Sequence, residues 1–264
     1  MNRLNRSMAG NRLSRTQAGL TLVELMISIT LGLLVLLAIG SIYVGSRQTY
    51  RTQEDNARIQ ESGRYALEVI GRSVRQAGAD AEMTANPIAA TVECVTPTCT
   101  AIDNTGGIRT QFYAGREELN GGAWITRDCT GGAVAAGAVV SNVFALNGTD
   151  LRCTGGVGGT QTLVSDVEDL QAVYGIDTNG DQAADQYVAT PADWNQVVTA
   201  RVCVLVRSAN NGITTTPQRY LNCAGALGTV TGAGAFTTAP AGDLRLHRAF
   251  VATYNLRNRV NGAP

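Results

Sequence analysis

Residues 19–46 read GLTLVELMISITLGLLVLLAIGSIYVGS, a run of predominantly apolar residues. From Leu25 to Ser46 it contains 22 residues without a charge. As a helix that rises about 1.5 Å per residue, this run is roughly 33 Å long, enough to cross the apolar core of a bilayer. The sequence therefore predicts one membrane-spanning helix near the N-terminus.

The charges on either side of the apolar run predict its orientation. Residues 1–18 contain four arginines and no acid, whereas Arg47 and Arg51 follow the run. An excess of positive charge before a span keeps that end in the cytoplasm, so the rest of the chain is expected to be exported. The small residue Gly19 stands before the apolar run rather than after it. Cleavage there would leave the hydrophobic helix attached to the mature chain.

Glu24 is the one charge within the first turns of the apolar segment. An unpaired carboxylate in lipid costs several kcal/mol, so a cation is expected beside it. Cleavage after Gly19 would give Leu20 a new α-amino group four residues from Glu24, about one helical turn away. That amine could belong to the same chain or to a neighbouring subunit. The alternative is a carboxylate that reaches the headgroup region and has no further role.

The segment from Gly19 to Met26, followed by an apolar helix, resembles the prepilin signature of type IV pilins and pseudopilins. Glu24 then stands at the fifth mature position. This resemblance implies cleavage between Gly19 and Leu20 by a prepilin peptidase and N-methylation of Leu20. It also implies that Glu24 docks against the amine of an adjacent subunit during assembly.

The helix is expected to continue beyond the membrane. No proline occurs before Pro87, and the stretch from Arg47 to Ala77 is rich in residues compatible with a helix. Gly78 is a plausible stop signal. One apolar stripe recurs at spacings of three and four, which indicates a face packed on other structure; its members are Ile59, Gly63, Ala66, Ile70, Val74 and Ala77.

Beyond residue 80 the sequence indicates a β-rich head. Val198–Arg207 alternates with period two, and its valine and alanine face suits the apolar stripe of the helix. Leu244–Leu256 is a second strand candidate. Five more strands are expected at Arg109–Tyr113, Ala123–Thr126, Val139–Leu146, Leu170–Ile176 and Gln186–Val188. The Gly-rich tracts 131–137, 155–159 and 228–241 are interpreted as surface loops.

Three parts of the head and two of the helix resemble the PilW family of minor pilins. They are Val167–Asp177, Trp194–Arg207, Arg248–Asn258, Ser46–Arg51 and Gly63–Leu67. The expected fold is α+β: a long N-terminal transmembrane pilin helix packed on an antiparallel β-sheet head. Residues 1–19 would form the leader, 20–46 the transmembrane half of the helix, 47–79 its periplasmic half, and 80–264 the disulfide-bonded head.

Composition argues against several function classes. The 21 basic residues balance 21 acidic ones, which does not favour a nucleic-acid-binding face. All basic residues are arginine, so there is no Schiff-base or phosphate-loop lysine. The single histidine, His247, is interpreted as a structural residue within a strand. We therefore expect no enzyme and no required cofactor.

Six cysteines lie in the part expected to be exported, where oxidising conditions favour disulfides. Six cysteines allow 15 pairings. Short local loops favour the pairs Cys94–Cys99, Cys129–Cys153 and Cys203–Cys223. A zinc cluster is the alternative, but the sequence contains no Cys-x-x-Cys spacing.

The stretch from residue 177 to 185 resembles a calcium-binding loop. Asp177, Asn179, Asp181 and Asp185 place oxygen side chains at loop positions 1, 3, 5 and 9. Two features depart from the pattern, because Gly180 stands at position 4 rather than 6 and Val188 rather than Glu stands at position 12. The alternative is a hairpin turn built on Asn179-Gly180, with solvated aspartates.

The resemblance to minor pilins implies a function in fibre assembly. Such a subunit is held in the inner membrane with a periplasmic head and then enters a pilus fibre, at its tip, in support of twitching motility and adhesion. Its implied partners are other minor pilins, the major pilin, the prepilin peptidase and the inner-membrane assembly machinery. Two alternatives stay open: a pseudopilin of type II secretion, and an adhesive or ligand-binding module displayed on a pilin anchor.

Overall fold

The computed structural model describes residues 19, 21–79 and 100–258. Its first element is helix α1, Leu22–Gln76, 55 residues long. Near its start, the hydroxyl of Thr21 accepts the Glu24 N–H at 3.3 Å. At its end, Gly78 adopts a positive φ of 76°, and its N–H donates to the Gln111 carbonyl at 2.8 Å. The long helix and its stop at Gly78 are therefore confirmed.

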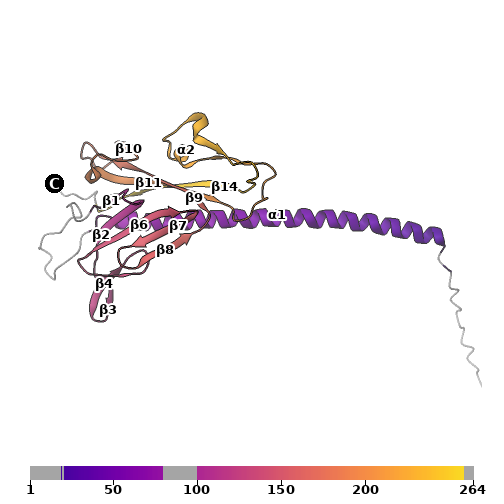
Figure 1. The fold of residues 1–264 in the computed structure, drawn as a ribbon, viewed down its shortest axis with the longest axis horizontal. Helices are drawn as coiled ribbons and strands as arrows, with labels where there is room; N and C mark the ends of the chain where they lie inside the picture. The colour runs from indigo at the N-terminus through magenta and orange to yellow at the C-terminus, as the bar shows by residue number, and fades with distance from the viewer. Residues whose placement is uncertain (1–18, 20, 80–99, 259–264) are drawn as a thin grey trace, which may run out of the picture. The chain divides into compact units, whose positions relative to one another are not determined.

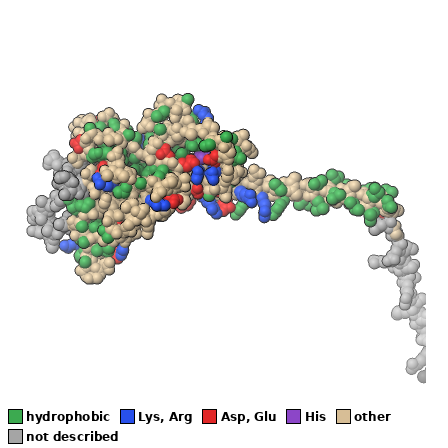
Figure 2. All heavy atoms as spheres, viewed as in Figure 1, with side chains coloured by type: hydrophobic (Ala, Val, Ile, Leu, Met, Phe, Trp, Pro, Cys, Tyr) green, Lys and Arg blue, Asp and Glu red, His purple; other side chains and the backbone are tan. Residues whose placement is uncertain are grey.

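The first half of α1 is covered with exposed apolar side chains. Every large apolar side chain from Leu22 to Val44 is between 50% and 73% exposed. Figure 2 shows these hydrophobic atoms along this part of the helix. By length and composition, α1 can cross a membrane. The chain divides into two compact units between Tyr50 and Arg51.

The second half of α1 carries the predicted stripe into the core of the head. Ile59, Ala66, Ile70 and Val74 are at most 3% exposed. They pack against alternate residues of strand β11, Val197–Arg207, including Val202. The predicted contact between the helical stripe and the valine-rich face is therefore confirmed.

Two antiparallel sheets surround this half of α1 (Figure 1). The five-stranded sheet has the order β1-β2-β6-β7-β8. Its strands are β1 (Ile102–Asp103), β2 (Ile108–Tyr113), β6 (Val139–Asn147), β7 (Asp150–Gly155) and β8 (Gly159–Val164). The four-stranded sheet has the order β10-β9-β11-β14. Its other strands are β9 (Val167–Ile176), β10 (Gln186–Val188) and β14 (His247–Asn255).

Smaller elements decorate these sheets. A three-stranded sheet joins β3 (Glu118–Asn120), β4 (Ala123–Arg127) and β5 (Ala133–Ala135). A two-stranded ribbon joins β12 (Arg219–Leu221) and β13 (Phe236–Thr238). The short helix α2 spans Cys223–Leu227, and two 3₁₀ turns span Trp194–Gln196 and Gly232–Ala235.

The structure confirms every expected strand but moves several boundaries. β14 begins at His247 rather than Leu244, because the Leu244 carbonyl instead accepts the N–H groups of Ile213 and Thr214. The Gly-rich tracts are not all loop: β5, the start of β8, and β13 lie within them. Backbone pairing with neighbouring strands orders these segments. Such pairing does not require alternating apolar residues, so the sequence contains no periodic pattern that would predict a strand.

Two glycines let α1 approach β14 closely. A Cβ atom at Gly63 would overlap the ring of Phe250, and one at Gly71 would overlap the ring of Tyr254. The Tyr254 hydroxyl also donates to the Leu67 carbonyl at 2.6 Å. Glycine in a helix interior costs about 1 kcal/mol relative to alanine. Glycine at these two positions therefore lowers the intrinsic stability of the helix but permits close packing against β14.

Candidate functional site

Glu24 lies in the first turn of α1, within the exposed apolar surface. Its own N–H is bound by Thr21, and its carbonyl accepts the Ser28 hydroxyl at 2.7 Å. Among the described residues, no ion pair involves the Glu24 carboxylate. Gly19 is described and exposed, whereas Leu20 and the leader 1–18 lie outside the described residues. A single carboxylate thus sits in a surface that is otherwise apolar.

Two of the three expected disulfides are present. Cys129 is joined to Cys153 with a Cα–Cα distance of 6.3 Å, which ties the segment after β4 to β7. Cys203 is joined to Cys223 at 5.6 Å, which ties β11 to α2. The third expected pair, Cys94–Cys99, lies outside the described residues. Both observed bridges therefore fasten a peripheral segment to a central strand of a sheet.

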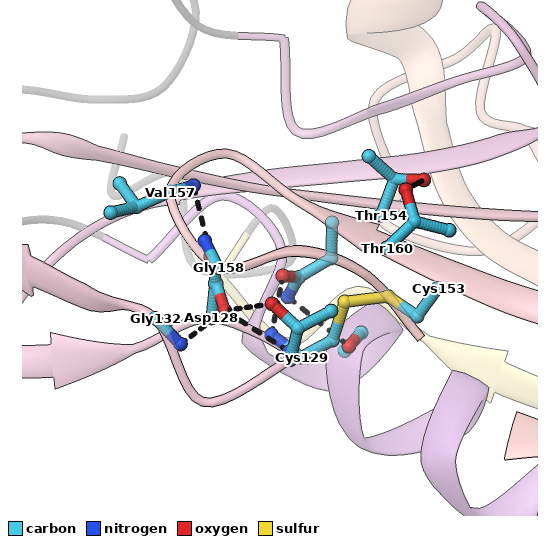
Figure 3. Close-up of a disulfide and its surroundings, with 11 residues drawn as sticks. Asp128, Cys129, Gly132, Cys153, Thr154, Val157, Gly158 and Thr160 are labelled. Atoms are coloured by element: carbon cyan, nitrogen blue, oxygen red, sulfur yellow. Dashed lines mark hydrogen bonds between the residues drawn. A yellow bond between two sulfur atoms is a disulfide. The ribbon is translucent and has the colours of Figure 1, made fainter. Parts of the chain in front are cut away.

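Asp128, next to the first bridge, is a structural centre that no sequence pattern indicated (Figure 3). The residue is only 5% exposed. One carboxylate oxygen accepts the N–H groups of Thr130 and Gly132 at 3.0 and 2.7 Å, and also the Thr130 hydroxyl. The other accepts the N–H groups of Val157 and Gly158 at 3.0 and 2.8 Å. The carboxylate thus joins two Gly-rich loops.

These hydrogen bonds determine the charge state of Asp128. Burial alone would raise the pKa of the carboxyl group, but the backbone N–H groups of Gly158, Val157 and Gly132 and the Thr130 hydroxyl favour the anion. Together they lower the pKa of Asp128 from 3.8 to about 2. The side chain is therefore ionised throughout the physiological pH range.

The proposed calcium ligands lie together in the exposed loop between β9 and β10. The Asn179 side-chain amide donates to Asp181 at 3.2 Å and to Asp185 at 3.3 Å. Asp177 accepts the N–H groups of Gly180 and Gln182, both at 2.7 Å. The donor set consists of oxygens, which suits a hard cation such as Ca²⁺. The same hydrogen bonds form the tight turn of the alternative interpretation, and the three described aspartates of the loop do not place their carboxylate oxygens within 4.8 Å of one another.

His247 belongs to a buried charge network. Its Nδ1 lies 2.8 Å from the Glu168 carboxylate, and its Nε2 lies 3.7 Å from Asp243. Arg207 pairs with Glu168 at 3.2 Å, and Arg245 pairs with Asp243 at 3.6 Å. Because each acid already has an arginine partner, the arrangement is a closed ion-pair network rather than an open metal site.

The network perturbs Glu168 and fixes the orientation of His247. Burial would raise the pKa of Glu168, but the hydrogen bond from His247 and the charges of His247 and Arg207 hold it below its ordinary value. The imidazole also stacks on the Tyr220 ring, with centroids 4.5 Å apart. A structural imidazole was expected from the sequence, but its partners were not, because they lie as many as 79 residues away.

A cavity of about 430 Å³, lined by both charged and apolar side chains, lies between α1 and the end of β11. Asp55 of α1 is 2% exposed there, and its carboxylate accepts the Asn210 side-chain amide at 3.1 Å. Arg58, Asp166 and Arg207 also line the cavity. Its mixed charges are mostly satisfied within the protein, since Arg58 pairs with Glu54 at 2.6 Å and Arg207 with Glu168.

Comparisons with known proteins match two parts of the chain to families. Residues 133–258 match the family model described as type IV pilus-assembly protein W, PilW. Residues 14–40 match the prokaryotic N-terminal methylation motif. A search of curated proteins gave no significant match. Among solved structures, a type IV-like pilin from Thermus thermophilus is similar at 13% identity and a TM-score of 0.41, over 76% of this chain and 98% of that one.

The two family matches coincide with the two parts of the structure that carry pilin features. The methylation motif spans the Gly19–Glu24 segment and most of the exposed apolar part of α1. The PilW match spans the four-stranded sheet that packs on the second half of α1. Together the two matches and the apolar N-terminal helix support a membrane-anchored type IV pilin of the PilW family with a prepilin signature.

Proposed function

We propose that this protein is a minor pilin that helps to initiate type IV pilus assembly within a minor-pilin complex at the fibre tip. It would support twitching motility and adhesion from there. The pilin assignment supports this proposal, because pilins act through association with other pilins after processing by a prepilin peptidase. Pilins are structural proteins, and we assign no catalytic step to this chain.

One observation carries the proposal: a single carboxylate, Glu24, in the exposed apolar half of α1. An apolar helix surface of this kind needs either lipid or other helices as its surroundings. In lipid, Glu24 needs a cation. The α-amino group of a cleaved Leu20 on an adjacent subunit would supply it, and the pairing would fix the register between packed helices.

The proposed route has two stages. Cleavage between Gly19 and Leu20 and methylation of Leu20 would leave the subunit in the inner membrane, with its head in the periplasm. Extraction into the fibre by the inner-membrane assembly machinery would then transfer α1 from lipid to the neighbouring helices. Partners at this stage would be other minor pilins and the major pilin.

Glu24→Ala tests the role of the carboxylate. We expect the variant to be cleaved and inserted normally, because the processing site and the apolar length are unchanged. It should be lost from purified fibres and from the minor-pilin complex, since no acid remains to pair with the amine. Glu54→Ala is the matched control: it removes an exposed acid of the same helix outside the apolar run. Normal incorporation of Glu24→Ala would overturn the mechanism.

Gene deletion separates the proposed function from its two alternatives. Loss of surface fibres is the expected result for a minor pilin that primes assembly. Lost exoprotein secretion with intact fibres would indicate a type II secretion pseudopilin. Intact fibres with reduced attachment would indicate an adhesive or ligand-binding module displayed on a pilin anchor.

We also propose that the loop containing Asp177, Asn179, Asp181 and Asp185 binds Ca²⁺. The support is the placement of four oxygen-bearing side chains at alternate positions of one nine-residue turn, in which the Asn179 amide donates to Asp181 and Asp185 at 3.2 and 3.3 Å. Bound calcium would offset two of the three negative charges that the aspartates of this loop carry. Its role would be to stabilise the β9–β10 connection of the head.

A further inference from the structure

Strand β14 forms one edge of the four-stranded sheet and pairs only with β11 among the described strands. At its first residue, His247, both outward backbone groups are bound by one side chain. The His247 N–H donates to the Gln218 amide oxygen at 2.7 Å, and the Gln218 amide nitrogen donates to the His247 carbonyl at 3.1 Å. An amide group therefore already occupies the first position on this edge.

The same geometry fixes which later groups point outward. In an antiparallel ladder, the N–H and C=O of one residue face the same side, and alternate residues face opposite sides. Since those of His247 face outward, those of Ala249, Val251, Thr253 and Asn255 do as well. No described residue forms a backbone hydrogen bond with these outward groups. Val251 is 39% exposed, and Thr253 and Asn255 are also exposed.

This edge lacks most of the features that normally prevent strand pairing. Natural edges are kept short, bulged or interrupted by proline. At the opposite edge of the same sheet, β10 has only three residues. In contrast, β14 has nine residues, no proline, and an unbroken register with β11. It therefore offers about seven residues of backbone to an added strand.

The charges around the edge are positive. Arg248 and Arg257 are exposed, and Arg75 lies over the Tyr254 ring at 5.6 Å; no ion pair joins any of the three to a described carboxylate. Glu68, an acid close to Tyr254, is paired with Arg72 at 3.8 Å. A second copy of this edge would bring arginines against arginines. An acidic segment would instead meet complementary charge.

We propose that the β14 edge binds an extended, acidic segment of a partner protein by strand addition between Ala249 and Asn255. The Gln218 amide bonds both the N–H and the C=O of His247, as alternate residues of an added antiparallel strand would do at Ala249, Val251 and Thr253. The arginines select against self-pairing and favour an acidic partner. This inference goes beyond the proposed assembly role, because it concerns the head alone and needs neither cleavage at Gly19 nor Glu24.

The test uses the full chain in detergent micelles and two capped peptides. One has the sequence Thr-Glu-Thr-Val-Thr-Glu-Thr, and in the other both glutamates are replaced by arginine. We expect the acidic peptide, at up to about 1 mM, to slow amide exchange at Val251 and Thr253 about tenfold. The arginine peptide should bind at least about tenfold more weakly.

Substitutions at Thr253 test whether the peptide binds at the β14 edge. Thr253→Pro removes an outward N–H without taking one from the β11 ladder, a change that edge strands tolerate. Thr253→Val keeps that N–H and is the matched control. Peptide protection should be lost in the first variant and kept in the second. If Thr253→Pro does not fold, the double variant Arg75→Glu/Arg248→Glu tests the proposal instead. This variant should bind the arginine peptide more tightly than the acidic peptide.

Three results would overturn the proposal. The first is no protection of Val251 and Thr253 by the acidic peptide. The second is equal binding of the two peptides, or binding that a folded Thr253→Pro variant retains. The third is a dimer of the full chain that Thr253→Pro dissociates, which would make a second copy, rather than an acidic partner, the occupant of the edge.

Discussion

At the scale of single residues, Asp128 shows how a Gly-rich head with few aromatic residues gains order. Its carboxylate accepts hydrogen bonds from four backbone N–H groups and one hydroxyl of two loops, the second of which lies up to 30 residues from Asp128 in the chain. Buried N–H groups need hydrogen-bond acceptors, and loops lack the regular backbone pairing that supplies acceptors in helices and sheets. One ionised side chain supplies them here, beside a disulfide that fixes the same segment.

Asp128→Asn should lower the free energy of unfolding by about 2 kcal/mol at pH 7. This figure follows from the depression of the Asp128 pKa from 3.8 to about 2. The amide nitrogen of asparagine would also face N–H donors, where it cannot accept a hydrogen bond. Denaturant titration of the full chain in micelles measures the loss. Glu117→Gln, an exposed position, is the control and should change stability little.

The pH dependence of the same variant is a second check. A carboxylate with a depressed pKa contributes stability that is fully present above its unfolded value, near 4, and disappears as the pH falls through about 2. The difference in stability between the wild-type protein and the Asp128→Asn variant should therefore shrink between pH 4 and pH 2. A difference that stays constant over this range would show that the carboxylate charge is not responsible.

Gly71→Ala should destabilise the head although alanine is the better helix former. The added methyl group overlaps the Tyr254 ring, and such overpacking costs about 1–3 kcal/mol, more than the gain of about 1 kcal/mol in helix propensity. The physical reason is tested by a double-mutant cycle. In a Tyr254→Ala background, Gly71→Ala should become neutral or stabilising, and simple additivity of the two changes would contradict the close contact.

At the scale of elements, the sequence predicted those helices and strands that bury one face and therefore show a hydrophobic period. The stripe on α1 and the alternation in β11 each bury one face, so a period of 3.6 or 2 appears in the residues. β8 was missed because its first four residues are polar or glycine and exposed, and β12 because three residues are too few to show a period. β7 does alternate in burial, but its buried positions include only one large apolar residue, Leu151. The Asp128 centre and the His247 network were missed for another reason. Their partners are backbone groups or distant side chains, which leave no local pattern.

Calcium should stabilise the β9–β10 loop in a way that a chelator reverses. We expect the melting temperature of the full chain to be higher in millimolar Ca²⁺ than in EDTA, because a ligand at about 100 times its Kd stabilises by about 2.7 kcal/mol. Asp177→Asn should abolish the difference, whereas Asp193→Asn, outside the loop, should preserve it. Asp177 also accepts loop N–H groups, so the difference between the two conditions, not the absolute melting temperature, is the readout. Equal melting temperatures in calcium and EDTA would remove the site.

At the scale of the whole molecule, one helix serves two units of opposite character. Up to Tyr50 its large apolar side chains are exposed, and from Arg51 onward its apolar stripe forms part of a closed core. The head therefore depends on α1 for its own stability, quite apart from membrane anchoring. This dependence separates the two halves of α1 experimentally, because they can be removed one after the other.

Removal of residues 1–50 should leave a soluble, cooperatively folding head, whereas removal of residues 1–78 should not. The longer deletion takes away Ile59, Ala66, Ile70 and Val74, each at most 3% exposed. Truncating one large buried aliphatic side chain already costs about 2–5 kcal/mol, and a whole domain is stable by only about 5–15 kcal/mol. Near-UV circular dichroism and thermal melting of the two truncated proteins measure the outcome.

A rescue experiment is the control. A synthetic peptide of residues 51–78, added to the protein that lacks residues 1–78, should restore part of its near-UV signal if the stripe completes the core. Equal stability of the two truncations would instead mean that α1 lies on the head without contributing to its folding, and the glycine contacts with β14 would then have no energetic role.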